Sequence, residues 1–313
     1  MNELIEKFDA LIIDSVNLSY KLFEKETPSV VSKKLVYKEF VKTFIKTIED
    51  LKKKYLHSDG EVYLLFDNYT SRFELQSAFM YASRKEIDEN YKKKRDKDSK
   101  EFYNSINLIR YYYLIGPSKY ISVRVDGLEA DDLVKPLLNT DLKDKRCLMV
   151  TSDLDWCRYI SQKVYWLHNL NAEPESAIQL SARLGFKVNE KSIICFKAIF
   201  GDPSDNIKGI ARNTEANVSE FIRLMNKVEA PEDLIMMARN DHSGELLMDI
   251  LGNERQFTIN LQLVSTINCR PEIFKANTLP GRNTETLYKS LREILGIESS
   301  KKFVFGNVKK QRV

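Results

Sequence analysis

Nine acidic side chains in four clusters are the residues of this sequence best suited to chemistry. Histidine and cysteine are scarce by comparison, with three histidines and four cysteines in 313 residues. None of them has the spacing of a zinc site, a disulfide framework or a histidine-based catalyst, so any chemistry must rely on carboxylates. The clusters are Asp14; Asp67; Glu129, Asp131 and Asp132 with Asp153 and Asp155; and Asp202 with Asp205.

These carboxylates need a cation if they share a small space, because like charges raise one another's pKa values and destabilise the fold. Oxygen ligands favour hard ions, so the expected cofactor is Mg²⁺, with Mn²⁺ as a substitute. Two such ions about 4 Å apart hydrolyse phosphodiesters: one activates water, and both stabilise the attacking and leaving oxygens. Taken singly, Asp14, Glu129 and Asp202 are explained equally well as helix caps or turn residues.

Short apolar runs precede most of these acidic residues and predict the elements that position them. The runs at 10–13, 62–66, 120–125 and 147–150 have the pattern of buried strands, and 129–138 and 154–160 have that of helices. Strands alternating with helices predict an α/β fold, with a mostly parallel central sheet and helices on both faces. The carboxyl ends of such strands meet at one edge, where ligands bind, and we expect the clusters to converge there.

The second half of the chain has a different character. After about residue 186 no convincing strand is present, and helical patterns occur at 189–200, 215–227, 231–239, 243–267 and 284–296. We therefore predict a catalytic α/β domain over 1–188 and a helical domain over 189–313 that ends in a basic tail. Four large or sulfur-containing residues are assigned to packing: Trp156, Cys157, Trp166 and Cys195.

A highly charged segment at 84–101 contains Tyr91, Lys92, Lys93, Lys94 and Arg95. As an isolated feature it would be a solvated helix of mixed charge. Opposite a carboxylate cluster, its cations would bind phosphates and stabilise charge on a scissile group, while Tyr91 would stack on an unpaired base. The formal net charge of +4 then hides an acidic pocket within a basic surface, which favours a nucleic-acid partner.

Several other classes of protein are excluded. No run approaches the roughly 18 apolar residues of a membrane span, and the N-terminus lacks the basic start of a secretion signal. The glycine-rich motifs of nucleotide-binding folds are also missing. We expect a monomeric, cytoplasmic protein without a membrane partner.

Three acidic motifs follow one another in the chain: GLEADD at 127–132, TSDLDW at 151–156 and KAIFGDPSDNI at 197–207. With Asp14, Asp67 and the basic stretch at 91–96, they resemble the 5′-nuclease superfamily of flap endonucleases and 5′-to-3′ exonucleases. The resemblance spans about residues 9–270 and is closest to bacteriophage members, including the ribonuclease H of T-even phages. It implies a PIN-like nuclease domain, a helical arch at about 84–104 that admits single-stranded 5′ ends, and a helix-three-turn-helix-like element that grips duplex DNA.

The resemblance also implies roles for individual residues. Lys92 and Arg95 match arch cations that contact the scissile phosphate, with Tyr91 beside them and Lys93 and Lys94 on the DNA path. The first metal ion would be served mainly by Asp14, Asp67, Glu129, Asp131 and Asp132, and the second by Asp153, Asp155, Asp202 and Asp205.

One motif departs from the family. A glycine-rich hairpin that binds a monovalent cation beside a DNA phosphate usually follows the last motif, but here only its first glycine, Gly209, is present. Residues other than glycine resist the positive φ angles of such a hairpin, so the sequence leaves a monovalent cation open. We instead predict duplex contacts at Lys208, Gly209 and Arg212, with the two cations acting by charge.

The leading hypothesis is a metal-dependent 5′-3′ exonuclease or flap endonuclease. It would hydrolyse phosphodiester bonds at the 5′ ends of DNA flaps, of nicked or branched duplexes, or of RNA primers in RNA:DNA hybrids during replication. One alternative is a noncatalytic, structure-specific nucleic-acid binder, against which the full carboxylate set argues. Another is a PIN-type ribonuclease acting on single-stranded RNA, which would explain neither the arch nor the helical half. The tail from Ser299 is a candidate contact for a sliding clamp or a single-strand binding protein.

Overall fold

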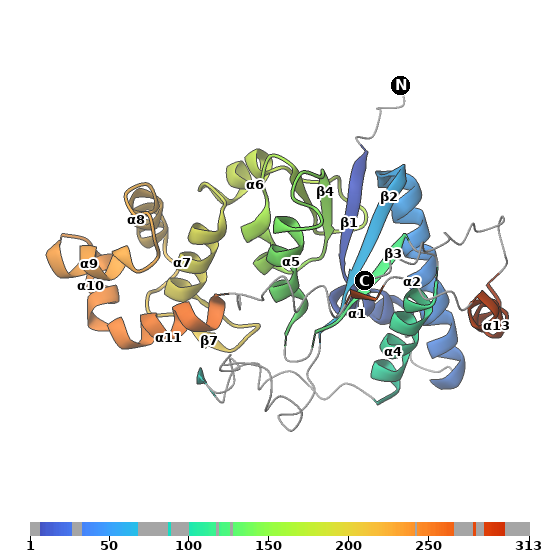
Figure 1. Cartoon of the computed structure of the whole chain (residues 1–313). Coiled ribbons are helices and arrows are strands. Elements are labelled where there is room, and N and C mark those ends of the chain that lie inside the picture. Colours follow the sequence, from blue (N-terminus) through green and yellow to red (C-terminus); the bar gives the residue numbers. More distant parts are fainter. Residues whose placement is uncertain are drawn as a thin grey trace, which may run out of the picture.

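A six-stranded sheet in the order β5-β4-β1-β2-β3-β8 lies at the centre of the protein (Figure 1). The structure is a computed structural model that describes residues 7–26, 33–67, 87–88, 100–116, 119–125, 128–241, 243–265, 278–279 and 285–297. Strands β1 to β5 run parallel to one another, and β8 pairs antiparallel with β3. Their bounds are β1 Phe8–Asp14, β2 Leu56–Leu65, β3 Tyr120–Val123, β4 Cys147–Val150, β5 Val164–Leu167 and β8 Thr278–Leu279.

Alternate residues of the central strand β1 face two separate cores, as the two-residue period of a strand requires. Leu11 and Ile13 join a core with helices α1 (Ser15–Glu26), α2 (Lys33–Tyr55) and α4 (Lys100–Leu114). Helix α13 (Glu285–Leu295) packs on the same side, where Arg292 Nη1 donates to Tyr112 Oη at 2.9 Å. This side of the sheet is therefore covered by helices from both ends of the chain.

The opposite face carries the second core. Ala10 and Ile12 pack there with α5 (Ala130–Asn139), the 3-10 helix η1 (Leu154–Tyr159), α6 (Ala177–Leu184) and α7 (Glu190–Phe200). The same core continues through Phe221 and Phe257 into the helical half. The predicted α/β fold with helices on both faces is confirmed. The domain boundary at 188/189 stays a prediction, and one hydrophobic core contains residues from both sides of it.

After α7, the helical half continues with α8 (Glu215–Met225), α9 (Asp233–Asn240), α10 (Glu245–Gly252) and α11 (Glu254–Val264). The single helix predicted at 243–267 is wrong: it divides at Gly252 and Asn253, where Asn253 ends α10 and precedes α11. The expectation of no strand is also wrong, since β6 (Gly201–Asp202) and β7 (Ile207–Lys208) form a hairpin between α7 and α8, and β8 joins the main sheet. Two-residue strands are too short to leave a periodic signal.

The four predicted strands are all present, and the structure adds β5 at the edge of the sheet. The helix predicted at 154–160 is a 3-10 helix over Leu154–Tyr159. Packing roles are confirmed for Trp156, Cys157, Trp166 and Cys195, each at most 2% exposed. Among the helices described, none combines the length and apolarity needed to cross a membrane.

Candidate active site

Three parallel strands bring acidic residues to one edge of the sheet. Asp14 is the last residue of β1, Asp67 follows β2, and Asp153 follows β4. Because β1 lies between β2 and β4, Asp14 is central. Burial raises the pKa of Asp14 well above its ordinary value, and the negative charges of Asp67 and Asp153 raise it further. The predicted convergence of these clusters is therefore present in the structure.

Backbone N–H groups orient several of these carboxylates. Asn17 N–H donates to Asp14 Oδ1 at 3.0 Å, and Ala130 N–H donates to Asp67 Oδ1 at 2.7 Å. Glu129 N–H donates to Asp132 Oδ2 at 3.1 Å, at the N-terminus of α5. These are helix-capping contacts, and caps prefer negative charge. Asp14, Asp67 and Asp132 therefore cap helices and also belong to the acidic cluster.

Thr151 joins the ends of β1 and β4. Its hydroxyl donates to Asp14 Oδ2 at 3.0 Å and accepts the Asp153 N–H at 3.0 Å. Its carbonyl oxygen accepts Trp166 Nε1–H at 2.8 Å, so the buried indole holds this turn from β5. The sequence placed Thr151 in a motif but assigned it no role at the site.

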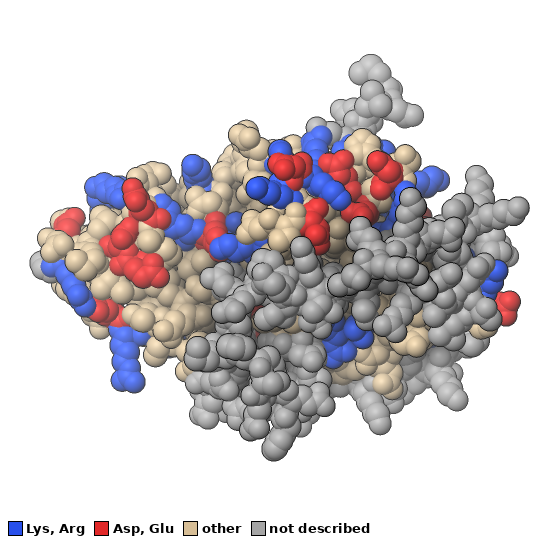
Figure 2. Space-filling view, viewed as in Figure 1, with Lys and Arg blue, Asp and Glu red and all other residues tan. Residues whose placement is uncertain are grey.

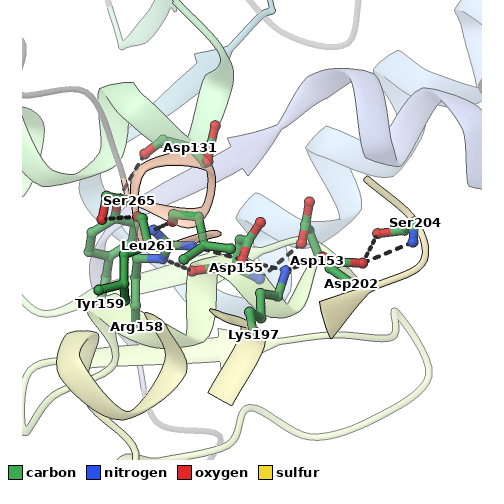
Figure 3. Close-up of polar contacts among 11 residues, drawn as sticks. Asp131, Asp153, Asp155, Arg158, Tyr159, Lys197, Asp202, Ser204, Leu261 and Ser265 are labelled. Atoms are coloured by element: carbon green, nitrogen blue, oxygen red, sulfur yellow. Dashed lines mark hydrogen bonds and ion pairs between the residues drawn. The ribbon is translucent and has the colours of Figure 1, made fainter. Parts of the chain in front are cut away.

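A second group of carboxylates surrounds the ammonium of Lys197 (Figure 3). Lys197 Nζ lies 2.5 Å from Asp155 Oδ1 and 2.6 Å from Asp202 Oδ2. Asp155, Asp202 and Asp205 each offer a carboxylate oxygen, and these oxygens all lie within 4.8 Å of one another. Three oxygen ligands at this separation, with no sulfur or imidazole among them, suit a hard divalent cation.

The charges in this group shift its pKa values in opposite directions. Burial works to raise the pKa of Asp155, but Arg158 and Lys197 outweigh it and hold that pKa below its ordinary value. For Asp153 the balance is reversed. Burial and the charge of Asp155 raise its pKa to about 7, although the positive charge of Lys197 acts to lower it. The cluster thus mixes an ionised Asp155 with an Asp153 that holds a proton up to about neutral pH.

The β6–β7 hairpin carries Asp202 and Asp205. Its backbone turns sharply, with φ of 84° at Gly201 and 62° at Asn206. Ser204 donates to Asp202 Oδ1 from its N–H at 2.9 Å and from its hydroxyl at 2.5 Å. Gly209 packs so closely on the end of α7 that a Cβ there would lie 2.5 Å from Phe200 O. The first glycine of the expected DNA-binding hairpin therefore has a packing role in closing this turn.

The remaining predicted nucleic-acid contacts fall into two groups. Lys208, the last residue of β7, and Arg212, on the connection from β7 to α8, are both exposed. Arg212 O accepts Asn217 Nδ2–H at 2.9 Å. The arch residues Tyr91, Lys92, Lys93, Lys94 and Arg95 lie outside the described residues. On the face shown in Figure 2, the described surface mixes basic and acidic side chains.

Two cations at the centre of the site were not predicted. Lys197 lies within a recognised motif, and its five-residue spacing from Asp202 is the only signal that the sequence offers. Arg158 follows Asp155 by one helical turn, but no pattern shows that its side chain is 0% exposed in the fold. Their pairing with aspartates reduces the repulsion that the carboxylates would otherwise suffer.

Comparisons with known proteins agree with this geometry. The family model described as "5'-3' exonuclease, N-terminal resolvase-like domain" matches residues 9–185. A 5'-3' exonuclease of Mycoplasmopsis pulmonis is 25% identical over 190 residues, which are 61% of this chain and 58% of that protein. The thermostable DNA polymerase I of Thermus thermophilus is 26% identical over 227 residues, 70% of this chain and 24% of the polymerase. The chain thus spans little more than half of the first relative and about a quarter of the second.

Solved structures show the same fold. The T5 5'-exonuclease with bound divalent metal ions (zinc) has a TM-score of 0.63 at 18% identity, covering 93% of this chain and 99% of its own. The catalytic core of Rad2 in complex with DNA substrate has a TM-score of 0.52 at 14% identity, covering 92% and 87%. Since the family model covers more than half of the residues, the chain belongs to the 5′-3′ exonuclease family, within the 5′-nuclease superfamily, and it has a PIN-like fold like that of the T5 5'-exonuclease.

Proposed function

We propose that this protein is a two-metal nuclease that hydrolyses phosphodiester bonds at the 5′ ends of nucleic acids. The observation that carries the proposal is that carboxylate oxygens of Asp155, Asp202 and Asp205 all lie within 4.8 Å of one another. Asp14, with its high pKa, lies beside Asp67 and Asp153 at the same edge of the sheet. Such a density of buried carboxylates is typical of a site that binds divalent cations.

The residues divide between two ions as the resemblance implies. Asp153, Asp155, Asp202 and Asp205 would hold one ion, and Asp14, Asp67, Glu129, Asp131 and Asp132 the other. When bound, Mg²⁺ or Mn²⁺ supplies Lewis acidity toward water and phosphate oxygens. The backbone donors of Asn17, Ala130 and Ser204 keep three of the carboxylates in fixed orientations, which lowers the cost of organising the site.

Cationic side chains from two parts of the chain would bind the substrate. Lys92 and Arg95 would contact the scissile phosphate, Tyr91 would stack on an unpaired base, and Lys93 and Lys94 would follow the strand. Exposed Lys208 and Arg212 would contact duplex phosphates beyond the hairpin. The substrates are DNA flaps, nicked or branched duplexes, and RNA primers in RNA:DNA hybrids, cleaved in the cytoplasm during replication by a monomer.

The deciding experiment uses a 5′-labelled flap DNA and a 5′-labelled RNA:DNA hybrid, each incubated with Mg²⁺, Mn²⁺ or EDTA. We expect short 5′ products only with a divalent ion, and their loss in Asp205→Asn and Asp155→Asn while binding to the flap persists. Asp144→Asn is the control, because Asp144 pairs with Lys163 on the surface and both side chains are more than half exposed. Equal product with and without EDTA would contradict the proposal. Binding without cleavage under every condition would instead identify a noncatalytic nucleic-acid binder.

A further inference from the structure

Arg158 connects the metal ligand Asp155 to a distant helix. Its side chain is 0% exposed, and all three nitrogens of its guanidinium group donate hydrogen bonds. Nε donates to Asp155 O at 2.8 Å, and Nη2 donates to Asp155 Oδ1 at 2.7 Å. Nη1 donates to Val264 O at 2.7 Å. Arg158 therefore fixes both the backbone and the carboxylate of Asp155 against one point on α11.

The acceptor at that point is suited to a cation. Val264 is the last residue of α11, so its carbonyl is one of the helix-end groups that lack a partner within the helix. The C-terminus of a helix also carries partial negative charge. The buried guanidinium of Arg158 donates the hydrogen bond that the Val264 carbonyl lacks within its helix, and the charge of Asp155 neutralises the guanidinium. The contact is therefore stable in the absence of water.

The same helix also contacts the backbone on both sides of the other two candidate ligands, Asp202 and Asp205. Asn260 of α11 is 0% exposed, and its Nδ2 donates to Ala198 O at 2.9 Å and to Lys208 O at 2.8 Å. Ala198 lies in α7, just before the hairpin that carries Asp202 and Asp205, and Lys208 is the last residue of that hairpin. Helix α11 is thus joined to the hairpin by Asn260, and it is joined to Asp155 by Arg158.

We infer that α11 is the scaffold that sets Asp155 relative to Asp202 and Asp205, and that Arg158 is the positioning residue that connects it to Asp155. The inference rests on the proposed metal-binding function. Arg158 acts through geometry rather than charge alone, since only a planar fork reaches the Asp155 carboxylate, the Asp155 carbonyl and Val264 O together. Without Arg158, Lys197 would be the one remaining cation at Asp155 Oδ1 among the residues that the structure describes. The carboxylate would then lose its fixed orientation toward an ion.

The test measures Mn²⁺ binding to the full chain by the electron paramagnetic resonance signal of free Mn²⁺, without substrate. Arg158→Gln is expected to weaken binding about tenfold, as loss of a group that orients a metal ligand does. Arg158→Lys is expected to remain weakened, because a lysine keeps the charge but cannot form the fork. Arg292→Gln is the matched control: Arg292 is a buried arginine bonded to Tyr112 on the other face of the sheet, and its loss should leave Mn²⁺ affinity unchanged.

The results separate this inference from the proposed function. If the wild-type chain binds no Mn²⁺, or Asp155→Asn binds it equally well, the metal site itself is wrong. If the wild-type chain binds and Arg158→Gln or Arg158→Lys matches it, only the positioning role is overturned. Tighter binding in Arg158→Gln would also overturn it, since that is the effect of removing a competing positive charge. If Arg158→Gln does not fold, as circular dichroism would show, Arg158→Lys decides the question.

Discussion

The ammonium nitrogen of Lys197 lies 2.6 Å from Asp202 Oδ2, in the space where the candidate metal ligands meet. The same nitrogen lies 2.5 Å from Asp155 Oδ1. Burial favours the neutral amine, but Asp155 and Asp202 outweigh it and raise the pKa of Lys197. A buried cation therefore neutralises part of the acidic cluster from within the chain.

Replacing this cation should make the fold depend on divalent ions. We expect Lys197→Gln to lower the free energy of unfolding in EDTA by about 3–5 kcal/mol, because it removes the buried cation that pairs with Asp202 and leaves Asp155 with Arg158 alone among the described cations. Mn²⁺ should restore more stability to this variant than to the wild type, since an ion bound only to the folded state stabilises it. Urea unfolding with EDTA and with Mn²⁺ measures both effects.

Lys135→Gln is the control for Lys197. Lys135 pairs with Glu190 at 2.7 Å, but both side chains are 37% exposed, so its loss should cost at most about 1 kcal/mol. Equal losses in the two variants, or a Lys197→Gln variant that Mn²⁺ does not rescue, would contradict this view of the site.

Metal binding should also depend on pH. The pKa of Asp153 is raised from 3.8 to about 7, so its protonated form stabilises the metal-free fold. That contribution is fully present below pH 3.8 and is lost as the pH rises through about 7. An ion must displace this proton, so Mn²⁺ affinity should rise between pH 6 and pH 8. Binding titrations at the two pH values test this, and Asp153→Asn should flatten the difference; a flat wild-type profile would show that Asp153 is already ionised.

Gly209 and Gly252 provide a matched pair of glycine substitutions. A Cβ at Gly209 would lie 2.5 Å from Phe200 O and 2.6 Å from Phe200 C, which are backbone atoms that cannot move aside. We expect Gly209→Ala to cost about 1–3 kcal/mol of stability and to weaken Mn²⁺ binding, because Asp202 and Asp205 belong to the same hairpin. A Cβ at Gly252 would meet no atom within 4 Å, so Gly252→Ala should be neutral or stabilise α10 by up to about 1 kcal/mol. Thermal unfolding compares the two variants. If Gly209→Ala is as stable as the wild type, the turn adapts to the added Cβ and this prediction is wrong.

Arg212 should contribute to duplex binding by charge. If its guanidinium contacts a phosphate, Arg212→Gln lowers duplex affinity at low salt and reduces the slope of log K against log salt by about 1. Fluorescence anisotropy over a salt series with a labelled duplex gives that slope. Arg239→Gln serves as the control, since Arg239 is already paired with Glu254 at 2.5 Å. An unchanged slope in Arg212→Gln would remove Arg212 from the interface.

The sequence by itself determined the four inner strands of the sheet and the edge at which the carboxylates gather. Both follow from local order: an apolar run forms a buried strand, an acidic residue follows it, and parallel strands end at one edge. The helical cap at Asp14 was equally local, because its carboxylate accepts the N–H of Asn17, three residues away. Such features depend on neighbours along the chain, which a sequence displays directly.

Only the tertiary structure decided how the cluster is neutralised and held. Arg158 and its acceptor Val264 are 106 residues apart, and Asn260 is 62 residues from Ala198. No periodicity reports that a particular arginine will be buried against a particular carbonyl, since this depends on how α7, η1 and α11 pack together. The types of the candidate metal ligands were therefore evident from the sequence, whereas Arg158, Lys197 and Asn260, which hold these residues in place, are brought there by packing between distant segments.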